Sequence, residues 1–423
     1  MLTLPMDFVS LFRNSAPYIH AYRGKTCVVW LRQQALSPER LKSTVSDLTL
    51  LHSLGLKLVL LIDTHHLSTP VSAQAVIDET LMHELIGQIG HFRYTLEALF
   101  SQGLVNSPMH GSKIRVVSGN FVMARPAGVH QGADLKHQGR VRRIDARGIA
   151  EHISREHLVL VPPLGYSVTG DVLYLPAEHL TVELARQLGA DKVLIVGNNP
   201  LELTQGRKEI GLAALQNILS QTQPLTPGYT ELNAASAVAA AGIARCHVID
   251  GATDGALLSE LFTRDGVGTL IALDQYDTFR SARIDDLQGI LTLLRPLEEQ
   301  QILVQREPEK LAAEIDHFIV NERDGMIVGC AAVYAFDNHQ AELACVAVHS
   351  DYQKNGRGDA LLKQIESRAR ELDIHQLFVL TTQTEHWFIE RGFHSADVHA
   401  LPANRQALYN NQRNSKVYIK TIV

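Results

Sequence analysis

The chain has 423 residues and a formal net charge of −6, and 45% of its residues are hydrophobic. This length favours two or three domains, and the apolar share supplies enough material for packed cores. The mildly acidic balance gives no general attraction to nucleic acids or to membrane surfaces.

The cysteines and the N-terminal stretch indicate the cellular setting. Cys27, Cys246, Cys330 and Cys345 are far apart and lie mostly in apolar runs, which is typical of reduced core residues rather than of disulfides or zinc sites. The first residues lack the basic start and long apolar core of a signal peptide, and no apolar run is long enough to span a bilayer. We therefore expect a cytoplasmic protein with no membrane or nucleic-acid partner.

The first part of the chain alternates between predicted strands and helices. A short helix is predicted at residues 7–13, ended by Pro17. The apolar strand 56–62 is expected to be parallel and buried on both faces. The other predicted strands are 26–31, 113–117, 158–161, 192–196, 246–249 and 269–273, and the other predicted helices are 41–54, 73–88, 91–101, 180–188, 232–242 and 257–262. This alternation predicts an α/β fold with an open, parallel-rich sheet sandwiched by helices, in which residues 205–229 are an irregular surface segment.

The pattern changes near residue 276. Residues 276–284 are expected to form a linker between a domain of residues 1–275 and an α+β domain of residues 285–423. The predicted order of the second domain is helices 285–297 and 308–314, strands 318–321, 326–336 and 341–348, a helix from Asp359, strand 376–380, helix 385–391 and strand 416–422.

Residues 341–362 join a predicted strand to a predicted helix through a loop that contains Gly356 and Gly358. A helix N-terminus carries N–H groups without intrahelical partners and a partial positive charge. Glycines let the backbone approach an anion without a Cβ in the way. The order of strand, glycine loop and helix therefore predicts a pyrophosphate site.

The loop spacing Q-x-x-G-x-G resembles the acetyl-CoA loop of the GCN5-related N-acetyltransferases (GNAT), and the element order of residues 285–423 matches that fold. The first part resembles the amino-acid kinase family, closest to the acetylglutamate kinases, in residues 118–121, 139–145, 190–192 and 246–269. With the C-terminal LYNNQRNSKV, the whole chain resembles the bacterial N-acetylglutamate synthase family.

This resemblance implies that acetyl-CoA and L-glutamate give N-acetyl-L-glutamate and CoA, the first step of arginine biosynthesis, by direct attack of the amine on the thioester. It implies Glu342 as the base, acting through a water, and Thr381 as the acid that protonates the thiolate. Thr382 and Tyr409 are alternative acids, because Phe388 stands where many GNAT domains have a tyrosine. The expected acetyl-CoA site consists of Val346, Ala347, Val348, Gln353, Lys354, Asn355, Gly356, Arg357, Gly358 and Asp359.

L-Glutamate brings two carboxylates, and a planar guanidinium can bind a carboxylate through two hydrogen bonds. The resemblance assigns Arg413 and Ser415 to the substrate and makes Arg306 a further candidate, although the family prefers two adjacent arginines where this chain has Gln305-Arg306. Direct attack needs no covalent nucleophile, so Cys345 is interpreted as a core strand residue.

The kinase-like part lacks the features that hold a transferred phosphate. Trp30 stands where the family has a lysine, and neither residues 31–34 nor residues 63–66 contain a glycine. We therefore expect no ATP binding and no kinase activity. His65 and His66 have no third ligand at a telling spacing, so no metal is expected.

The resemblance implies that this part instead senses L-arginine, which inhibits the enzyme, and that the chain forms a homo-oligomer, with a hexamer suspected. The positions that match the family's arginine site are Tyr18, Lys192, His247, Glu260, Gly266 and Gly268.

Two other functions stay open at this point. An arginine-responsive GNAT enzyme that acts on another amine, such as a protein lysine, would have no need for the paired cations Arg306 and Arg413. A non-catalytic scaffold with both sites decayed would not be expected to keep the intact loop at residues 353–358.

Overall fold

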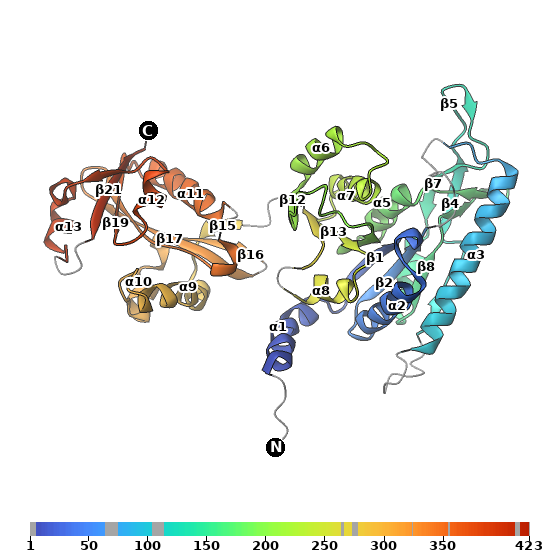
Figure 1. Cartoon of the computed structure of the whole chain (residues 1–423), viewed down its shortest axis with the longest axis horizontal. Coiled ribbons are helices and arrows are strands. Elements are labelled where there is room, and N and C mark those ends of the chain that lie inside the picture. The colour runs from blue at the N-terminus through green and yellow to red at the C-terminus, as the bar shows by residue number, and fades with distance from the viewer. Residues whose placement is uncertain are drawn as a thin grey trace, which may run out of the picture. The chain divides into compact units, whose positions relative to one another are not determined.

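The computed structural model describes residues 6–63, 75–103, 114–263, 266–272, 278–323, 325–353, 356–410 and 415–422. The chain divides into two compact units, Met1–Asp274 and Gln275–Val423 (Figure 1). Among the described residues, no helix is long and apolar enough to cross a membrane.

An eight-stranded sheet forms the centre of the N-terminal unit. Its strands are β1 (Thr26–Leu31), β2 (Lys57–Ile62), β3 (Val116–Val117), β8 (Leu158–Val161), β11 (Lys192–Gly197), β12 (Glu209–Gly211), β13 (Arg245–Asp250) and β14 (Thr269–Ala272). They are arranged in the order β12-β14-β13-β11-β1-β2-β8-β3. Every neighbouring pair is parallel except β13 with β14, so the predicted parallel-rich sheet is confirmed.

Helices cover both faces of this sheet, as predicted. One face carries α1 (Met6–Tyr22), α2 (Pro38–Ser53), α3 (Glu79–Gln102) and α8 (Ala256–Phe262), and the other carries α4 (Ala146–Ser154), α5 (Ala177–Leu188), α6 (Leu212–Gln221) and α7 (Tyr229–Ala240). A hydrophobic core lies on each face of the sheet, and strand β1 contributes side chains to both cores, because successive side chains of a strand point to opposite faces. Val28 and Trp30 join the core under α4 to α7, whereas Val29 and Leu31 join the core under α2, α3 and α8.

A smaller mixed sheet was not predicted from the sequence. Its strands are β4 (Val122–Pro126), β7 (Gly139–Ile144), β9 (Leu164–Tyr166) and β10 (Val172–Tyr174), and a hairpin of β5 (Val129–His130) and β6 (Ala133–Asp134) lies between β4 and β7 in the chain. In this sheet β4 pairs with β9 in parallel, and the other pairs are antiparallel. Most of these strands are very short, and β7 reads GRVRRI, which has too few apolar residues for a clear alternating pattern.

Three helices differ from the prediction. Helix α1 continues through Pro17 to Tyr22, because its C-terminal half packs on α8, where the Ser15 hydroxyl donates to the Phe262 carbonyl over 2.9 Å. Helix α3 is one helix rather than two, because its buried face runs unbroken past Gly90, a residue that costs only about 1 kcal/mol in a helix interior. Helix α6 lies within residues 205–229, which were expected to be irregular.

A seven-stranded sheet forms the C-terminal unit. Its strands are β15 (Thr278–Ser281), β16 (Phe318–Arg323), β17 (Met326–Phe336), β18 (Gln340–Val348), β19 (Gln376–Thr381), β20 (His394–Ala396) and β21 (Lys416–Thr421), in the order β15-β16-β17-β18-β19-β21-β20. Its helices are α9 (Leu287–Glu299), α10 (Pro308–Ala313), α11 (Arg357–Glu371), α12 (Glu385–Ile389) and α13 (Ala403–Ala407). Helices α9 and α11 bury their apolar faces in different cores, on opposite sides of the sheet in Figure 1.

The start of this unit falls within the segment that the sequence assigned to a linker. Strand β15 pairs with β16 along its whole length. Arg280 in β15 forms an ion pair with Glu322. Its guanidinium also donates two hydrogen bonds to the Asp286 carboxylate, over 2.7 and 2.8 Å. These contacts tie residues 278–281 into the C-terminal unit.

The feature that positions the site is the divergence of β18 from β19. The two strands are parallel neighbours only where residues 340–342 pair with residues 376–378. Among the described residues they form no further pairs, although β18 continues to Val348 and β19 to Thr381. Cys345 has a left-handed φ of 53° at a shift of the β17–β18 register, so a bulge bends β18 at this point.

Candidate functional site

The glycine loop leads into α11 as the sequence predicted. Gly356 is the N-cap with a φ of 73°, and no side chain caps the first turn of the helix. The N–H groups of that turn can therefore bind an anion. Gly358 allows Trp387 to pack closely against the helix, since a Cβ there would lie 3.0 Å from Cζ2 of Trp387. Lys354 and Asn355 lie outside the described residues.

Three other predicted cofactor residues brace this loop. Gln353 donates to the Val348 carbonyl over 3.1 Å. The buried Arg357 guanidinium lies 5.0 Å from the centre of the Tyr352 ring. Asp359 forms an ion pair with Arg391, whose guanidinium stacks 4.2 Å from the Trp387 ring. The structure therefore gives these side chains a part in holding the loop in shape, and their contact with a cofactor stays a prediction.

Residues 346–348 form the part of β18 that has diverged from β19. Val346 packs against the core that α11 covers, and Ala347 belongs to the core that α9 covers, as strand alternation requires. The β19 side of this stretch has no paired strand among the described residues. Its backbone groups can therefore accept an extended ligand as an added strand would be accepted.

Glu342 lies at the last residue pair before β18 and β19 diverge, and an arginine holds its carboxylate. Arg405 Nε donates to Oε2 over 2.6 Å and Arg405 Nη2 donates to Oε1 over 3.1 Å. Both side chains are mostly buried, with 14% of Glu342 and 21% of Arg405 exposed. Arg405 was not predicted as a site residue, because it lies 63 residues from Glu342 and nothing in the spacing connects them.

Arg306 lies in the connection between α9 and α10, and its guanidinium contacts Tyr334 of the neighbouring strand β17. Its Nη1 donates to Glu314 over 3.0 Å and to the Tyr334 hydroxyl over 2.5 Å, and Tyr334 in turn donates to Glu314 over 2.8 Å. Tyr334 is directly opposite Glu342 in the β17–β18 ladder. Side chains that are directly opposite on antiparallel strands are close neighbours, so Arg306 and Glu342 belong to one cluster.

Cys345 is part of the same region and is not an activated thiol. Burial raises the pKa of Cys345 to about 11, and the nearby Arg306 only partly offsets this effect. The group is therefore a protonated thiol near neutral pH, which agrees with the interpretation of Cys345 as a core residue.

The proposed acids at the other strand are engaged in local hydrogen bonds. Thr381 Oγ1 lies 2.9 Å from Thr384 Oγ1 and accepts the Thr384 N–H over 3.1 Å. Tyr409 donates to the Ser415 carbonyl over 2.6 Å, and the next residue, Lys416, pairs with Thr381 across β19 and β21. The structure thus brings Thr381, Tyr409 and Ser415 to one end of β19. Arg413 lies outside the described residues.

In the N-terminal unit, Glu260 organises the residues that were assigned to arginine. Its Oε2 accepts the N–H groups of Val267 and Gly268 over 2.7 Å each, and its Oε1 lies 2.6 Å from His247 Nδ1. A Cβ at Gly266 would collide with the Glu260 carboxylate, and Gly266 has a left-handed φ of 55°. Glycine is therefore required at this position.

The charges of this pair follow from its surroundings. Burial lowers the pKa of His247, and the bond to Glu260 only partly offsets this effect. Burial opposes ionisation of Glu260, but the bonds from His247 and the two backbone N–H groups lower the pKa of Glu260. His247 is therefore neutral and donates from Nδ1, which leaves Nε2 as a buried acceptor with no hydrogen-bond partner among the described residues.

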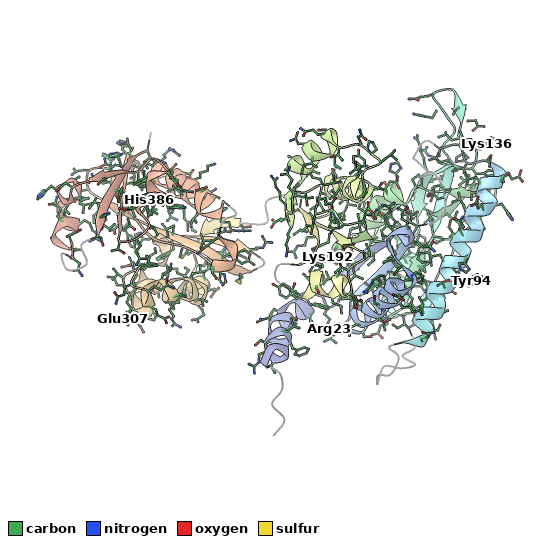
Figure 2. The ribbon with its side chains drawn as sticks, viewed as in Figure 1. Arg23, Tyr94, Lys136, Lys192, Glu307 and His386 are labelled. Carbon is green, nitrogen blue, oxygen red and sulfur yellow. The ribbon has the colours of Figure 1, made fainter. Side chains whose placement is uncertain are left out.

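An aromatic and a cationic group complete this cluster. Lys192 Nζ lies 4.2 Å from the centre of the Tyr22 ring, and Figure 2 shows Lys192 among the side chains of the N-terminal unit. Tyr18 lies one helical turn before Tyr22 in α1, with 6.3 Å between the ring centres. All six residues predicted for arginine therefore lie where α1, α8 and the β11, β13 and β14 strands meet.

Comparisons with known proteins cover both units. The sequence model of the Amino acid kinase family matches residues 32–200, and that of the Acetyltransferase (GNAT) family matches residues 285–407. An amino-acid acetyltransferase of Pseudomonas putida (strain GB-1) is 44% identical, over 98% of this chain and 100% of that protein, and the one from Azotobacter vinelandii (strain DJ) is also 44% identical over the same shares. This chain belongs to the amino-acid acetyltransferase family.

Solved structures of the family agree with this assignment. The N-acetylglutamate synthase of Neisseria gonorrhoeae, complexed with coenzyme A and L-arginine, is 31% identical with a TM-score of 0.83, over 98% of this chain and 99% of that chain. Its complex with coenzyme A and N-acetyl-glutamate is 32% identical with a TM-score of 0.59, over the same shares. The predicted fold, an amino-acid kinase-like unit followed by a GNAT unit, is thus confirmed.

In this member of the acetyltransferase family, an internal ion pair occupies the point of the kinase-like sheet where ligands usually bind. In the strand order, β2 lies on one side of β1 and β11 lies on the other, so the direction of the connections reverses between β1 and β11. Ligands of such sheets usually bind at the C-terminal ends of the strands at this reversal. There Arg32 Nη1 lies 2.5 Å from Oε1 of the fully buried Glu231, which also accepts the Asn198 N–H over 2.8 Å. Residues 64–74, which include His65 and His66, lie outside the described residues.

Proposed function

We propose that this chain transfers the acetyl group of acetyl-CoA to the amine of L-glutamate, releasing N-acetyl-L-glutamate and CoA, as a step of arginine biosynthesis. The observation that carries this proposal is the divergence of β18 from β19 at Glu342, beside the uncapped N-terminus of α11. It is supported by the full-length similarity to a synthase solved with coenzyme A and with N-acetyl-glutamate.

Acetyl-CoA is proposed to bind along β18. Its pyrophosphate takes the N–H groups that begin α11, near Gly356 and Gly358, and its pantetheine arm hydrogen-bonds with the edge of residues 346–348. This path brings the thioester carbonyl to the gap between the two strands. Backbone N–H groups at that edge are available to hold the oxyanion of the tetrahedral intermediate.

L-Glutamate is proposed to bind between the two arginines that flank Glu342. In the structure Arg405 is paired with Glu342, and Arg306 is paired with Glu314. A substrate carboxylate that binds Arg405 would replace Glu342 as its partner and so release the carboxylate that must act as the base. Arg413 and Ser415 are proposed to hold the second carboxylate.

The reaction then needs proton transfers from the substrate nitrogen and to the CoA sulfur. The substrate ammonium loses a proton to Glu342 through a water, and the amine attacks the thioester carbon. When the carbon–sulfur bond breaks, the CoA thiolate takes a proton from a nearby hydroxyl, and the nitrogen of the tetrahedral intermediate gives up its second proton, which restores that hydroxyl. Thr381 is the proposed donor because it ends β19 across the gap, and Tyr409 is the alternative, since both lie at this end of the strand.

The N-terminal unit is proposed to bind L-arginine as an inhibitor, as the complex of the Neisseria synthase with L-arginine suggests. The buried His247 Nε2 can accept a hydrogen bond from a guanidinium, and the anionic Glu260 favours its positive charge. Lys192 is suited to the carboxylate of the same ligand. We assign residues 1–275 to this regulatory role and residues 285–423 to catalysis.

We also propose a homo-oligomeric protein of the cytoplasm. Leu11 and Phe12 of α1 are each more than half exposed, and two large apolar side chains side by side on a helix suit a contact between subunits. A hexamer is the assembly suggested by the resemblance. Sedimentation equilibrium of the chain and of its Leu11→Asp, Phe12→Asp variant tests this proposal, because the variant should dissociate.

The proposed reaction is tested by mass spectrometry of the products from acetyl-CoA with either L-glutamate or a lysine-containing peptide. N-Acetyl-L-glutamate from the first mixture and no acetylated peptide from the second is the expected result. Glu342→Gln should abolish product formation, whereas Glu309→Gln, at an exposed position of α10, should not. Acetylated peptide without N-acetyl-L-glutamate would favour the alternative amine and contradict the proposal.

A further inference from the structure

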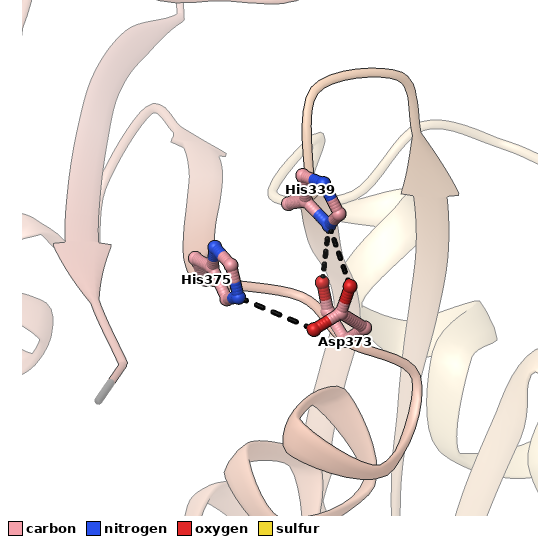
Figure 3. A group of neighbouring side chains, drawn as sticks. All are labelled: His339, Asp373 and His375. Atoms are coloured by element: carbon pink, nitrogen blue, oxygen red, sulfur yellow. Dashed lines mark hydrogen bonds and ion pairs between the residues drawn. The ribbon is translucent and has the colours of Figure 1, made fainter.

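Three side chains with metal-binding atoms meet at the surface of the C-terminal unit, away from the residues assigned to catalysis. His339 lies in the turn between β17 and β18, and Asp373 and His375 lie in the connection between α11 and β19 (Figure 3). The Asp373 carboxylate contacts both imidazoles, 3.1 Å from His339 Nδ1 and 3.3 Å from His375 Nε2, and His339 Nδ1 also lies 2.7 Å from the Asp373 carbonyl oxygen. This group was not anticipated, because His339 is 34 residues from Asp373 in the sequence.

The distances suit a shared ligand. One ligand atom from each residue lies within 4.8 Å of the other two. Around a tetrahedral zinc ion with bonds of about 2.1 Å, neighbouring ligand atoms lie about 3.4 Å apart. The side chains are 56%, 75% and 66% exposed, in chain order, so small rotations can bring the three atoms together without repacking a core.

The backbone already holds the two segments in register. His339 and Asp373 both have left-handed φ angles, of 56° and 57°, which are uncommon for residues other than glycine. The His339 carbonyl accepts the N–H groups of His375 and Gln376 over 2.8 and 3.2 Å. The imidazole rings of His339 and His375 are stacked, with 4.7 Å between their centres. The backbone segments that carry the three side chains are therefore held together before any ion binds.

We propose that His339, Asp373 and His375 form a binding site for a divalent transition-metal ion of the zinc type. Two imidazole nitrogens and one carboxylate oxygen are the ligands that such ions prefer, and a water completes the coordination of an exposed three-residue site. The proposal is independent of the acetyl-transfer reaction.

A bound ion would join two segments that determine the geometry of the cleft. Residues 340–342 are where β18 and β19 still pair, directly after His339, and the strands diverge beyond them. The ion would fasten the β17–β18 turn to the α11–β19 connection at the closed end of the diverging strands. It would thereby limit the opening of this pair of strands without touching the reacting groups.

The site is tested by isothermal titration of the full chain, prepared without a polyhistidine tag and treated with a chelator, with Zn²⁺. Asp373→Asn removes one ligand charge and suits the left-handed backbone, and His375→Ala removes an imidazole. Each should weaken binding at least about tenfold, because even the loss of a supporting contact to a metal ligand costs that much. His399→Ala is the matched control, since His399 is exposed and its carboxylate neighbour Asp397 lies 3.8 Å away.

A second measurement distinguishes this site from adventitious binding to other histidines. Zn²⁺ should slow hydrogen exchange at the amides of His375 and Gln376 in the unmodified chain and in His399→Ala, but not in Asp373→Asn. Zn²⁺ affinity that is equal in all four proteins, or the absence of Zn²⁺ binding to the unmodified chain, would overturn the proposal. Thermal unfolding of each variant without metal verifies that it is folded.

Discussion

The carboxylate of Glu342 and the guanidinium of Arg405 form a two-point ion pair at the place where β18 leaves β19. In this arrangement the proposed base is held by a cation that also suits a substrate carboxylate. The pair therefore links substrate binding to the availability of the base.

Replacement of Arg405 should affect the amino-acid substrate more than acetyl-CoA. Arg405→Lys keeps the charge but loses the planar pair of donors, so kcat/KM for L-glutamate should fall at least about tenfold, equivalent to about 1.4 kcal/mol. The KM for acetyl-CoA should change by less than about twofold, as steady-state kinetics with each substrate varied will measure. Asn404→Ala, one residue earlier in the same helix, is the control; equal effects of Arg405→Lys on both substrates would contradict the assignment.

Replacement of either loop glycine by alanine should lower the stability of the C-terminal unit, for a different reason at each position. Gly358→Ala places a Cβ 3.0 Å from Trp387, and such overpacking costs roughly 1–3 kcal/mol. Gly356→Ala has open space but must adopt a left-handed φ, which costs roughly 1–2 kcal/mol. Thermal unfolding with and without CoA measures both effects. Only Gly358→Ala should be partly rescued by Trp387→Phe; rescue of neither variant would show that Trp387 does not set the requirement.

The stability of the N-terminal unit should depend on His247 in mildly acidic solution. Burial lowers the pKa of His247 below its usual value of 6.5 in the folded chain. Below pH 6.5 the unfolded chain binds a proton that the folded chain does not. The free energy of unfolding therefore decreases as the pH is lowered from 6.5 to the pKa of His247 in the folded chain. Urea unfolding at pH 7.5 and 5.5 should show a smaller loss of stability for His247→Gln than for the unmodified chain. An equal or larger loss in the variant would contradict this prediction.

Cys345 should be unreactive and dispensable for the chemistry. Because burial raises the pKa of Cys345 to about 11, very little thiolate exists at pH 7.5, and alkylation by iodoacetamide should be slow. Cys345→Ala should keep kcat within about threefold, since direct transfer forms no acyl-cysteine. A burst of CoA release followed by a slow steady rate, lost in Cys345→Ala, would indicate a covalent intermediate instead.

The sequence predicted the features that local pattern determines. The order of strand, glycine loop and helix at β18 and α11, and the apolar strands β1, β2 and β8, have strong periodicity or composition, and the structure contains them. Family resemblance added the cluster around Glu260, whose members are separated in the chain but are brought together by α1, α8 and β13.

What the sequence did not reveal depends on contacts between distant segments. Arg405 is recognisable only because α13 brings it to Glu342, and the trio of His339, Asp373 and His375 forms only when two turns meet. Helix α1 passes through Pro17 because packing on Phe262 outweighs the local cost of proline. In each case a tertiary contact decides the outcome, and no single stretch of sequence contains it.

The proposed reaction and its regulation are tested together by the initial rate of thiol release from acetyl-CoA in the presence of L-glutamate, measured as L-arginine is added. We predict release that requires L-glutamate and that L-arginine depresses, with the arginine response lost in Glu260→Gln. Glutamate-dependent release that L-arginine leaves unchanged would remove the regulatory role of the N-terminal unit. No glutamate-dependent release, from protein shown to bind acetyl-CoA, would contradict the central claim.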